Sequence, residues 1–489
     1  MSSEENGSDL KLKAVSGMAW TTFSSVTMRI LAGLSNLVLA KLLAPEVFGI
    51  VSIANIVIGA MELFSDFGVG KALIRYKGDV RTAANVSFTL RLIQGVVLFG
   101  IALVLADYLA IYYKTPELKA VISVLGANFL IMSMGAIPVA LLSKDMKFKQ
   151  QALPQILPAF LQMVTAITLA LMGFGVWSIV FGMVIFVTSQ SALYWFASPI
   201  KLKFQIRLDV VKELMSFALP LFASGFVIYA SFNIDRAVIG KVLGLAALGY
   251  YFFAFTVIFL PTTEIVYLVN RVMYPVYAKF SDLIWDLKNA YVKTLRYVFL
   301  VSVPLCIGIP LFGGNLFIAL YGDKWVNAIV PMQVMGVFAF MRAFGATTGN
   351  VFLALGKTKY LFANAAISLI LAALFVYPAA TRYGITGVAG LYSSVWVIGV
   401  VILIIWLKKL INLKPAEIAV LIWKPLLASA ISMGPVKALS GKVDLSIIYI
   451  LLPAIVIMIV IYFAIIILID DIIKKSLVET IKTRRPALY

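Results

Sequence analysis

The sequence predicts an all-α polytopic membrane protein with about 14 transmembrane helices. Hydrophobic residues make up 62% of the 489-residue chain and charged residues only 13%, and the mean hydropathy is +1.01. Apolar runs recur along the whole length, each about 20 residues long and able to cross a hydrocarbon layer about 30 Å thick. Two segments whose numbers differ by 200 also repeat one another, which indicates two similar halves.

The repeat lies in two short turns between apolar runs. Ala40-Lys41-Leu42-Leu43, followed by Gly49, matches Gly240-Lys241-Val242-Leu243, followed by Gly249. A soluble enzyme gains nothing from this arrangement, whereas two similar helical lobes of a transporter enclose a cavity that opens to either side. The repeat therefore predicts a transporter architecture.

The predicted spans follow the apolar runs in order, with centres near residues 27, 60, 95, 130, 162, 186, 225, 258, 306, 340, 370, 396, 429 and 457. The first six form an N-terminal lobe in residues 1–205, and the next six a C-terminal lobe in 206–410. Two additional spans and a cytoplasmic tail occupy 411–489. Because each lobe has an even number of spans, the lobes are expected to be parallel repeats. The sixth and twelfth spans open alike, with Phe174-Gly175-Val176-Trp177 and Tyr383-Gly384-Ile385-Thr386-Gly387.

Basic residues concentrate in alternate loops. If the N-terminus is cytoplasmic, the inside segments carry groups of Lys and Arg that begin at Lys11, Arg75, Lys144, Lys201, Arg271, Lys357, Lys408 and Lys474. The outside loops hold only eight basic residues: Lys41, Lys114, Lys119, Lys241, Lys324, Arg382, Lys437 and Lys442. This pattern predicts both termini in the cytoplasm. It also accounts for the net charge of +19 through topology and anionic lipids, without nucleic acid.

The signals of an enzyme are missing from the sequence. The chain has no histidine, and its single cysteine, Cys306, lies inside an apolar run. There is no Gly-rich P-loop and no paired-cysteine motif, and the 22 acidic residues are scattered. We therefore expect no catalytic residue, no metal and no cofactor.

Six ionisable residues lie inside predicted spans, where each costs roughly 3 kcal/mol or more. They are Arg29, Arg91 and Arg342, and Glu62, Asp66 and Glu264. They either face a water-filled cavity or pair with each other and hold helices together, as Arg29 would with Glu62 or Asp66. Arginine in a cavity suits an anionic substrate, because its planar fork of donors matches phosphate and stays charged. Several amides, Asn128, Gln155, Gln162, Asn270, Gln333 and Asn350, either line a polar path or make interhelical hydrogen bonds.

Several stretches are similar to the polysaccharide-unit (O-antigen or Wzx-type) flippases of the multidrug/oligosaccharidyl-lipid/polysaccharide exporter superfamily. They are Ala40-Lys41-Leu42-Leu43-Ala44-Pro45, Ser65-Asp66-Phe67-Gly68-Val69-Gly70, the run from Asn270 to Lys279, Tyr321-Gly322-Asp323-Lys324-Trp325, the run from Arg342 to Gly356, and the run from Gly384 to Gly390. The resemblance covers essentially the whole chain through the order and spacing of these motifs.

The resemblance implies a V-shaped, MATE-like fold in the cytoplasmic (inner) membrane. It implies that the substrate is an oligosaccharide linked through pyrophosphate to a polyprenyl lipid, which is flipped to the outer leaflet by alternating access. Arg29, Arg91 and Arg342 would then bind the substrate, and Glu62, Asp66 or Glu264 would couple transport to an ion. Membrane lipids and a glycan polymerase machinery would be the other partners.

Two alternative functions remain at this stage. A cation-coupled exporter of drugs or small metabolites would favour an acidic cavity, but the buried charges are balanced between three arginines and three carboxylates. A membrane polysaccharide polymerase would need a large outer loop with catalytic side chains. The longest outside connection, around residues 107–119, is too small for that.

Overall fold

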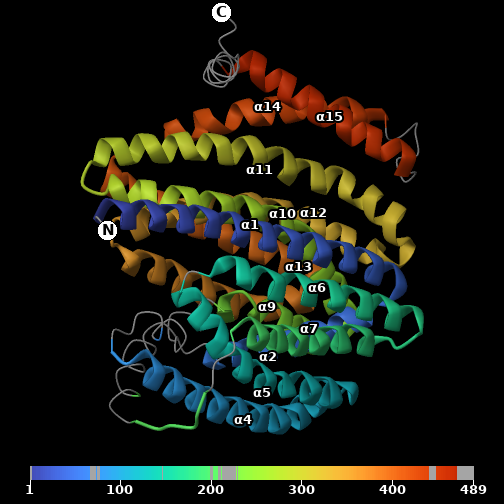
Figure 1. The fold of residues 1–489 in the computed structure, drawn as a ribbon. Helices are drawn as coiled ribbons and strands as arrows, with labels where there is room; N and C mark the ends of the chain where they lie inside the picture. The colour runs from blue at the N-terminus through green and yellow to red at the C-terminus, as the bar shows by residue number, and fades with distance from the viewer. Residues whose placement is uncertain are drawn as a thin grey trace, which may run out of the picture. The chain divides into compact units, whose positions relative to one another are not determined.

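The computed structural model describes residues 3–65, 73, 78–145, 147–198, 202–207, 211, 227, 229–439 and 448–470. Within these ranges the chain is helical and has no β-strand (Figure 1). Eleven of the described helices are long and apolar enough to cross a membrane. The prediction of an all-α polytopic membrane protein is therefore confirmed.

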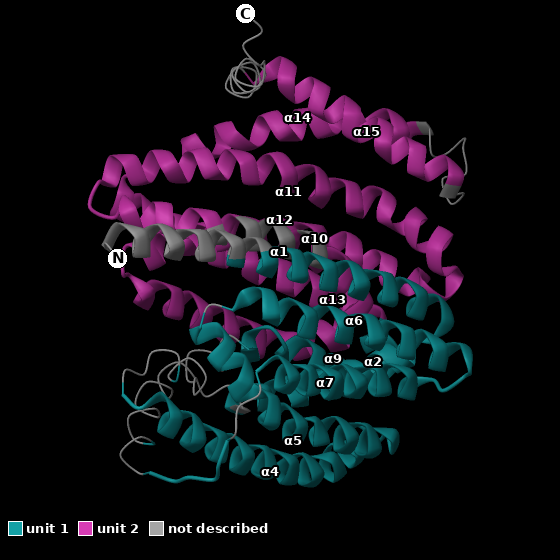
Figure 2. Cartoon of the chain, viewed as in Figure 1, with its two compact units in different colours: residues 1–249 teal, residues 250–489 magenta. Residues whose placement is uncertain are grey.

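The chain divides into two compact units, residues 1–249 and 250–489 (Figure 2). The helices of the first unit are α1 (Ser3–Leu42), α2 (Pro45–Ser65), α4 (Val80–Tyr112), α5 (Glu117–Lys144), α6 (Phe148–Leu171), α7 (Val176–Ala197) and α9 (Ile234–Val242). In this unit α4 packs on α5, α6 packs on α7, and α1 packs on α6. The predicted boundary between lobes at 205 and 206 stays a prediction.

The second unit contains α10 (Leu245–Lys279), whose first five residues belong to the first unit, α11 (Ile284–Tyr321), the short 3₁₀ helix η1 (Asp323–Trp325), α12 (Val326–Ala354), α13 (Thr358–Ile411), α14 (Pro415–Leu439) and α15 (Ile448–Ile469). Here α12 packs on α13 and on α11, and α14 packs on α11 and α15. Thirteen of the predicted span centres fall in described helices, two of them in α13. The centre near 225 lies outside the described residues, so the total of 14 stays a prediction.

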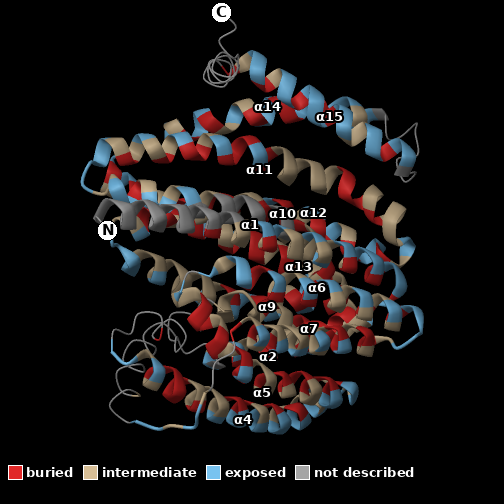
Figure 3. Cartoon of the chain, in the orientation of Figure 1, coloured by how far each residue is buried: buried red, intermediate tan, exposed pale blue. Residues whose placement is uncertain are grey.

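Along the helices, buried residues on one side alternate with exposed apolar residues on the other (Figure 3). In α4, for example, Ala102 and Ala106 are fully buried, whereas Val104 and Ile111 are 73% and 78% exposed. A soluble protein rarely leaves so much apolar surface in contact with water. The exposed apolar sides are therefore those expected to face lipid.

The Tyr321–Trp325 motif closes the turn between α11 and α12. Gly322 ends α11 with a φ of 77°, a left-handed conformation that favours glycine. The turn then carries Trp325 into the interior, where its ring is fully buried with its centroid 4.2 Å from that of Phe253 on α10. The motif therefore joins three helices of the second unit through one aromatic side chain.

Two glycines break the helical conformation in the same way, one in each unit. Gly175, before α7, has φ 54° and ψ −125°, and Gly384, inside α13, has φ 61° and ψ −153°. Only glycine readily adopts this conformation. These are the glycines of the two similar span openings, and Gly384 divides α13 into the two predicted spans around residues 370 and 396.

The repeated turns contact each other inside the first unit. A Cβ atom on Gly49 would overlap the backbone carbonyl of Leu245, and a Cβ atom on Gly249 would overlap the carbonyl of Pro45. The two contacts are reciprocal, because each glycine meets the first residue of the other helix and the two pairs are related by a shift of 200 positions. Glycine is required at both positions because the first turns of α2 and α10 approach within backbone contact.

Candidate functional site

Arg342 lies in the middle of α12 and is held by two residues of α10. Its Nη1 atom donates a hydrogen bond of 3.2 Å to Oγ1 of Thr262. Its guanidinium carbon lies 3.8 Å from the centroid of the Phe259 ring. The side chain is half-buried, and Thr262 is buried and also donates to the carbonyls of Ile258 and Phe259. The arginine is thus placed by a cation–π contact and a hydrogen bond from a single helical turn.

An aromatic cluster from three helices supports this position. The Phe259 ring stacks on Phe255 with centroids 4.9 Å apart, and Phe255 lies 5.5 Å from Phe338. Phe338, one turn before Arg342 on α12, contacts Tyr392 and Trp396 of α13 at 5.5 Å and 5.4 Å. Since these rings pack in a mostly buried core, they fix α10, α12 and α13 around the arginine.

Such an arrangement can present a fixed cation inside an apolar span. An arginine stays charged under all ordinary conditions, and its five donors form a planar fork that matches phosphate oxygens. Because Arg342 is only half-buried, part of its side chain is reachable from outside the core. The site therefore suits an anionic group that enters the membrane region.

Arg91 lies in the first unit, where it is linked to the end of α2. Its Nη1 atom is 3.4 Å from Oε1 of Gln94, one turn later on α4, and Gln94 donates to the backbone carbonyl of Phe64. Glu62 is exposed in the same last turns of α2. The structure thus brings Arg91 and Glu62 to one region of this unit.

Arg29 is half-buried on α1, which packs against α6. Ser24, just over one turn earlier, donates a 2.7 Å hydrogen bond to Oε1 of Gln155 on α6. Gln333 likewise donates from α12 to the carbonyl of Pro310 on α11, at 3.1 Å. For these two amides the structure supports the interhelical role rather than a polar path.

Two predicted residues cannot be described. Asp66 lies outside the described residues, and so does the side chain of Glu264, although its backbone belongs to α10. Arg342 belongs to one unit and Arg29, Arg91 and Glu62 to the other. In the described part of the chain, no three or more acidic, cysteine or histidine side chains are grouped closely enough to hold a metal ion.

Tyr229, which lies 200 positions after Arg29, was not identified as a site residue from the sequence. The Tyr229 hydroxyl donates to the carbonyl of Ile56 on α2, at 2.8 Å. Glu62 and Arg236 lie close enough to interact with it electrostatically. The signal available in the sequence was the polar run that follows Tyr229, in which Asn233 donates back to the Tyr229 carbonyl at 2.9 Å.

Comparison with known proteins places the chain in a family. Residues 38–330 match the family model described as "Polysaccharide biosynthesis protein". The chain is 26% identical over 422 residues to the teichuronic acid biosynthesis protein TuaB of Bacillus subtilis, covering 86% of this chain and 87% of that protein. It is 23% identical to the lipopolysaccharide biosynthesis protein WzxC of Escherichia coli, covering 72% of each.

Two solved structures share the fold. One is the lipid II flippase MurJ in an inward closed conformation, with a TM-score of 0.74 and 17% identity over 94% of this chain and all of that chain. The other is an inward-facing MATE family multidrug resistance transporter, with a TM-score of 0.66 and 18% identity over 80% of this chain and 95% of that chain. The expected MATE-like fold class is therefore confirmed. Since the family model spans more than half of the sequence, the chain belongs to the polysaccharide biosynthesis protein family.

Proposed function

We propose that the protein flips polyprenyl-pyrophosphate-linked oligosaccharide units from the cytoplasmic to the outer leaflet by alternating access, for surface polysaccharide biosynthesis. Its relatives are named for teichuronic acid, lipopolysaccharide and succinoglycan biosynthesis, the last as a transport protein of Rhizobium meliloti. The fold neighbour MurJ is named as a lipid II flippase. A lipid-linked oligosaccharide is a substrate class that fits both the polysaccharide biosynthesis named for the relatives and the lipid flipping named for MurJ.

The observation that carries the proposal is the fixed charge of Arg342. Its contacts with Phe259 and Thr262 orient the guanidinium within a membrane-spanning helix. A pyrophosphate must cross the same apolar region, and a preorganised arginine lowers the cost of bringing it there. An oriented cation inside a span favours an anionic substrate over the cationic substrates of a drug exporter.

We also propose roles for the other predicted residues, for the termini and for the two lobes. Arg29 and Arg91 would extend the basic surface of the transport path, and Glu62, Asp66 or Glu264 would bind the coupling ion. The protein would lie in the inner membrane, with both termini in the cytoplasm. The distribution of basic residues supports this orientation. Residues 1–205 and 206–410 would form the moving lobes, and a glycan polymerase would receive the product.

The test is a flipping assay in proteoliposomes that contain a fluorescent lipid-linked oligosaccharide. The wild-type protein should accelerate exposure of the sugar on the opposite leaflet relative to protein-free vesicles. Arg342→Ala should lower the rate at least about tenfold, the effect of losing hydrogen bonds to a charged group. Arg342→Lys keeps the charge but loses the fork, so we expect an intermediate rate. Arg382→Ala, which removes an exposed arginine on α13, is the matched control.

A wild-type rate in Arg342→Ala would show that the arginine has only a packing role. No acceleration by folded wild-type protein would refute the flippase proposal itself. Export of a cationic dye by the same vesicles, without movement of the lipid-linked sugar, would favour the exporter instead.

A further inference from the structure

A buried carboxylate of the second unit is shared by two cations from two other helices. Asp470 directly follows α15, and its side chain is only 5% exposed. Its Oδ1 atom is 2.9 Å from Nη1 of Arg296 on α11, and its Oδ2 atom is 3.5 Å from Nζ of Lys424 on α14. We name Arg296, Lys424 and Asp470 the C-terminal ion cluster. The charges of these three described side chains sum to one excess positive charge. Arg296 and Lys424 lie in the N-terminal halves of α11 and α14, and Asp470 follows the C-terminal end of α15.

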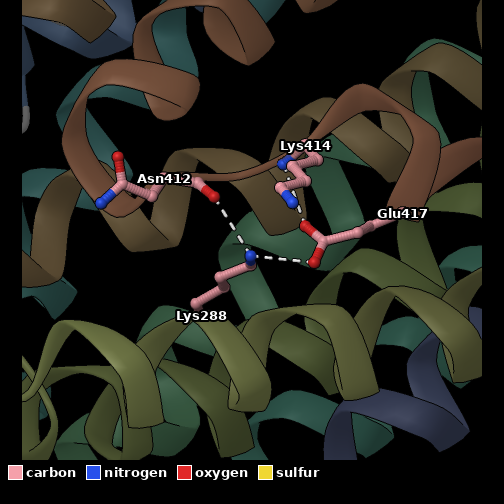
Figure 4. A network of polar contacts seen from close by, with 4 residues as sticks. All are labelled: Lys288, Asn412, Lys414 and Glu417. Carbon is pink, nitrogen blue, oxygen red and sulfur yellow. Dashed lines mark hydrogen bonds and ion pairs between the residues drawn. The ribbon is translucent and has the colours of Figure 1, made fainter.

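A second ion pair beside this cluster is balanced by itself. Nζ of Lys288 lies 2.8 Å from Oε1 of Glu417 and donates to the carbonyl of Asn412 at 3.1 Å (Figure 4). The other carboxylate oxygen of Glu417 accepts a 2.9 Å hydrogen bond from the backbone N–H of Lys414. Because Glu417 is engaged by Lys288 and by the start of α14, it does not neutralise the excess charge of the C-terminal ion cluster.

The cluster lies between an open surface hollow and an apolar cavity of the second unit. On one side the open hollow of about 340 Å³ is lined by Arg296, Glu417, Val420 and Leu421 among others. Arg296, Val420 and Leu421 also line a small pocket of about 30 Å³ that contains Lys424 and Asp470. On the other side Leu300 belongs both to this pocket and to a cavity of about 320 Å³ between α11, α14 and α15. Charged and apolar spaces therefore follow one another along α11.

The apolar space of about 320 Å³ has the chemistry of a hydrocarbon site. Its lining includes Pro304, Gly308, Met433 and Met458, and its one polar side chain is Tyr462. The hydroxyl of Tyr462 donates to the carbonyl of Leu300 at 2.8 Å and is thereby satisfied. Such a lining offers dispersion and no hydrogen bonds, which favours an alkyl chain over water.

We propose that this part of the molecule binds one anionic phospholipid. Its phosphate lies at Arg296 and Lys424, and one acyl chain lies in the apolar space between α11, α14 and α15. The single excess charge matches a monoanionic headgroup. In the predicted topology this end of the helices faces the cytoplasmic leaflet, which is rich in anionic lipids, and basic pockets between membrane helices bind such headgroups. The bound lipid would tie α14 and α15 to α11.

The test measures lipid binding to the purified full chain in detergent by native mass spectrometry. Phosphatidylglycerol should bind more tightly than phosphatidylcholine. Lys424→Gln removes the excess charge but keeps the closer Arg296–Asp470 pair, so the protein should fold and its affinity for phosphatidylglycerol should fall about fivefold. Lys437→Gln makes the same substitution at an exposed position near the other end of α14 and should leave binding unchanged.

Further variants distinguish binding of the lipid headgroup from binding of the acyl chain. Lys424→Arg keeps the charge and should retain binding. This variant tests the role of the charge even if Lys424→Gln does not fold. Gly308→Leu fills the apolar space beside Met433 and should weaken phosphatidylglycerol but not glycerophosphate. Equal binding of the two phospholipids, or unchanged binding in Lys424→Gln, would overturn the proposal. Binding of a polyprenyl phosphate without any binding of phosphatidylglycerol would also overturn the proposal, because the apolar space would then belong to the transported lipid. Binding needs no transport, so this result is independent of the flipping assay.

Discussion

Arg342 carries a charge into a long apolar helix, and two residues of α10 hold it there. A charged side chain near the bilayer centre costs about 3 kcal/mol or more. A cation–π contact contributes about 0.5–2 kcal/mol and a hydrogen bond to a charged group about 1.5–3 kcal/mol. The contacts with Phe259 and Thr262 are therefore comparable with the cost. This explains how the arginine is kept in an orientation that a substrate can use.

Replacing Phe259 by leucine tests this account at the level of one side chain. Leucine keeps an apolar residue but removes the ring under the guanidinium, so the affinity for the lipid-linked substrate should fall about two- to thirtyfold. Phe259→Tyr keeps the ring and should stay near wild type. Phe255→Leu removes the neighbouring ring, which stacks on Phe259, and serves as the packing control. Equal losses in Phe255→Leu and Phe259→Leu, measured as substrate binding, would contradict the cation–π role.

At the scale of elements, the positions at which helices break define the fold as much as the helices do. The helix α13 extends from Thr358 to Ile411, yet it contains two spans because Gly384 takes a positive φ. Gly175 does the same before α7 in the first unit. At the other repeated motif, Gly49 and Gly249 let α2 and α10 meet through their backbones. The repeated glycines therefore mark the places where the chain turns or makes its closest contacts.

Gly384→Ala should destabilise the protein because alanine rarely adopts the backbone conformation found there. The expected cost is about 1–3 kcal/mol, although a Cβ atom would have open space around it. Gly175→Ala should behave alike. The matched control is Gly434→Ala on α14, where the space is also open and the backbone is helical, so a neutral or slightly stabilising effect is expected. Thermal unfolding in detergent measures all three, and equal melting temperatures for Gly384→Ala and Gly434→Ala would rule out the conformational explanation.

At the scale of the whole molecule, the chain consists of two helical units, each with its own buried residues and its own exposed apolar sides. The family and the fold neighbours fit this organisation. The orientation in the membrane stays a prediction from the basic residues. It assigns Lys41 and Lys357, both exposed near helix ends, to opposite sides.

Cysteine labelling tests that orientation. In a Cys306→Ser background, Lys41→Cys should react with a membrane-impermeant maleimide added to intact cells, and Lys357→Cys should react only after the membrane is opened. The single native cysteine makes the background simple. Labelling of both positions from the same side would contradict the predicted number of spans between them.

Composition and apolar periodicity were sufficient for the fold class, because spanning a membrane requires long apolar helices wherever the chain crosses it. The same reasoning identified Arg342 as a functional candidate, since a buried charge is rare in a span. It did not find the C-terminal ion cluster, because Arg296, Lys424 and Asp470 are separated by more than 40 residues at each step and nothing local links them.

The sequence by itself determined that this is a helical membrane protein with repeated turn motifs. Hydropathy and turn chemistry act over a few residues, so they can be read from the order of residues along the chain. Only the tertiary structure decided which side chains meet. The ring under Arg342, the carbonyls against Gly49 and Gly249, and the two cations on Asp470 all depend on how helices pack. Packing is a relation between segments distant in sequence, and no local pattern encodes it.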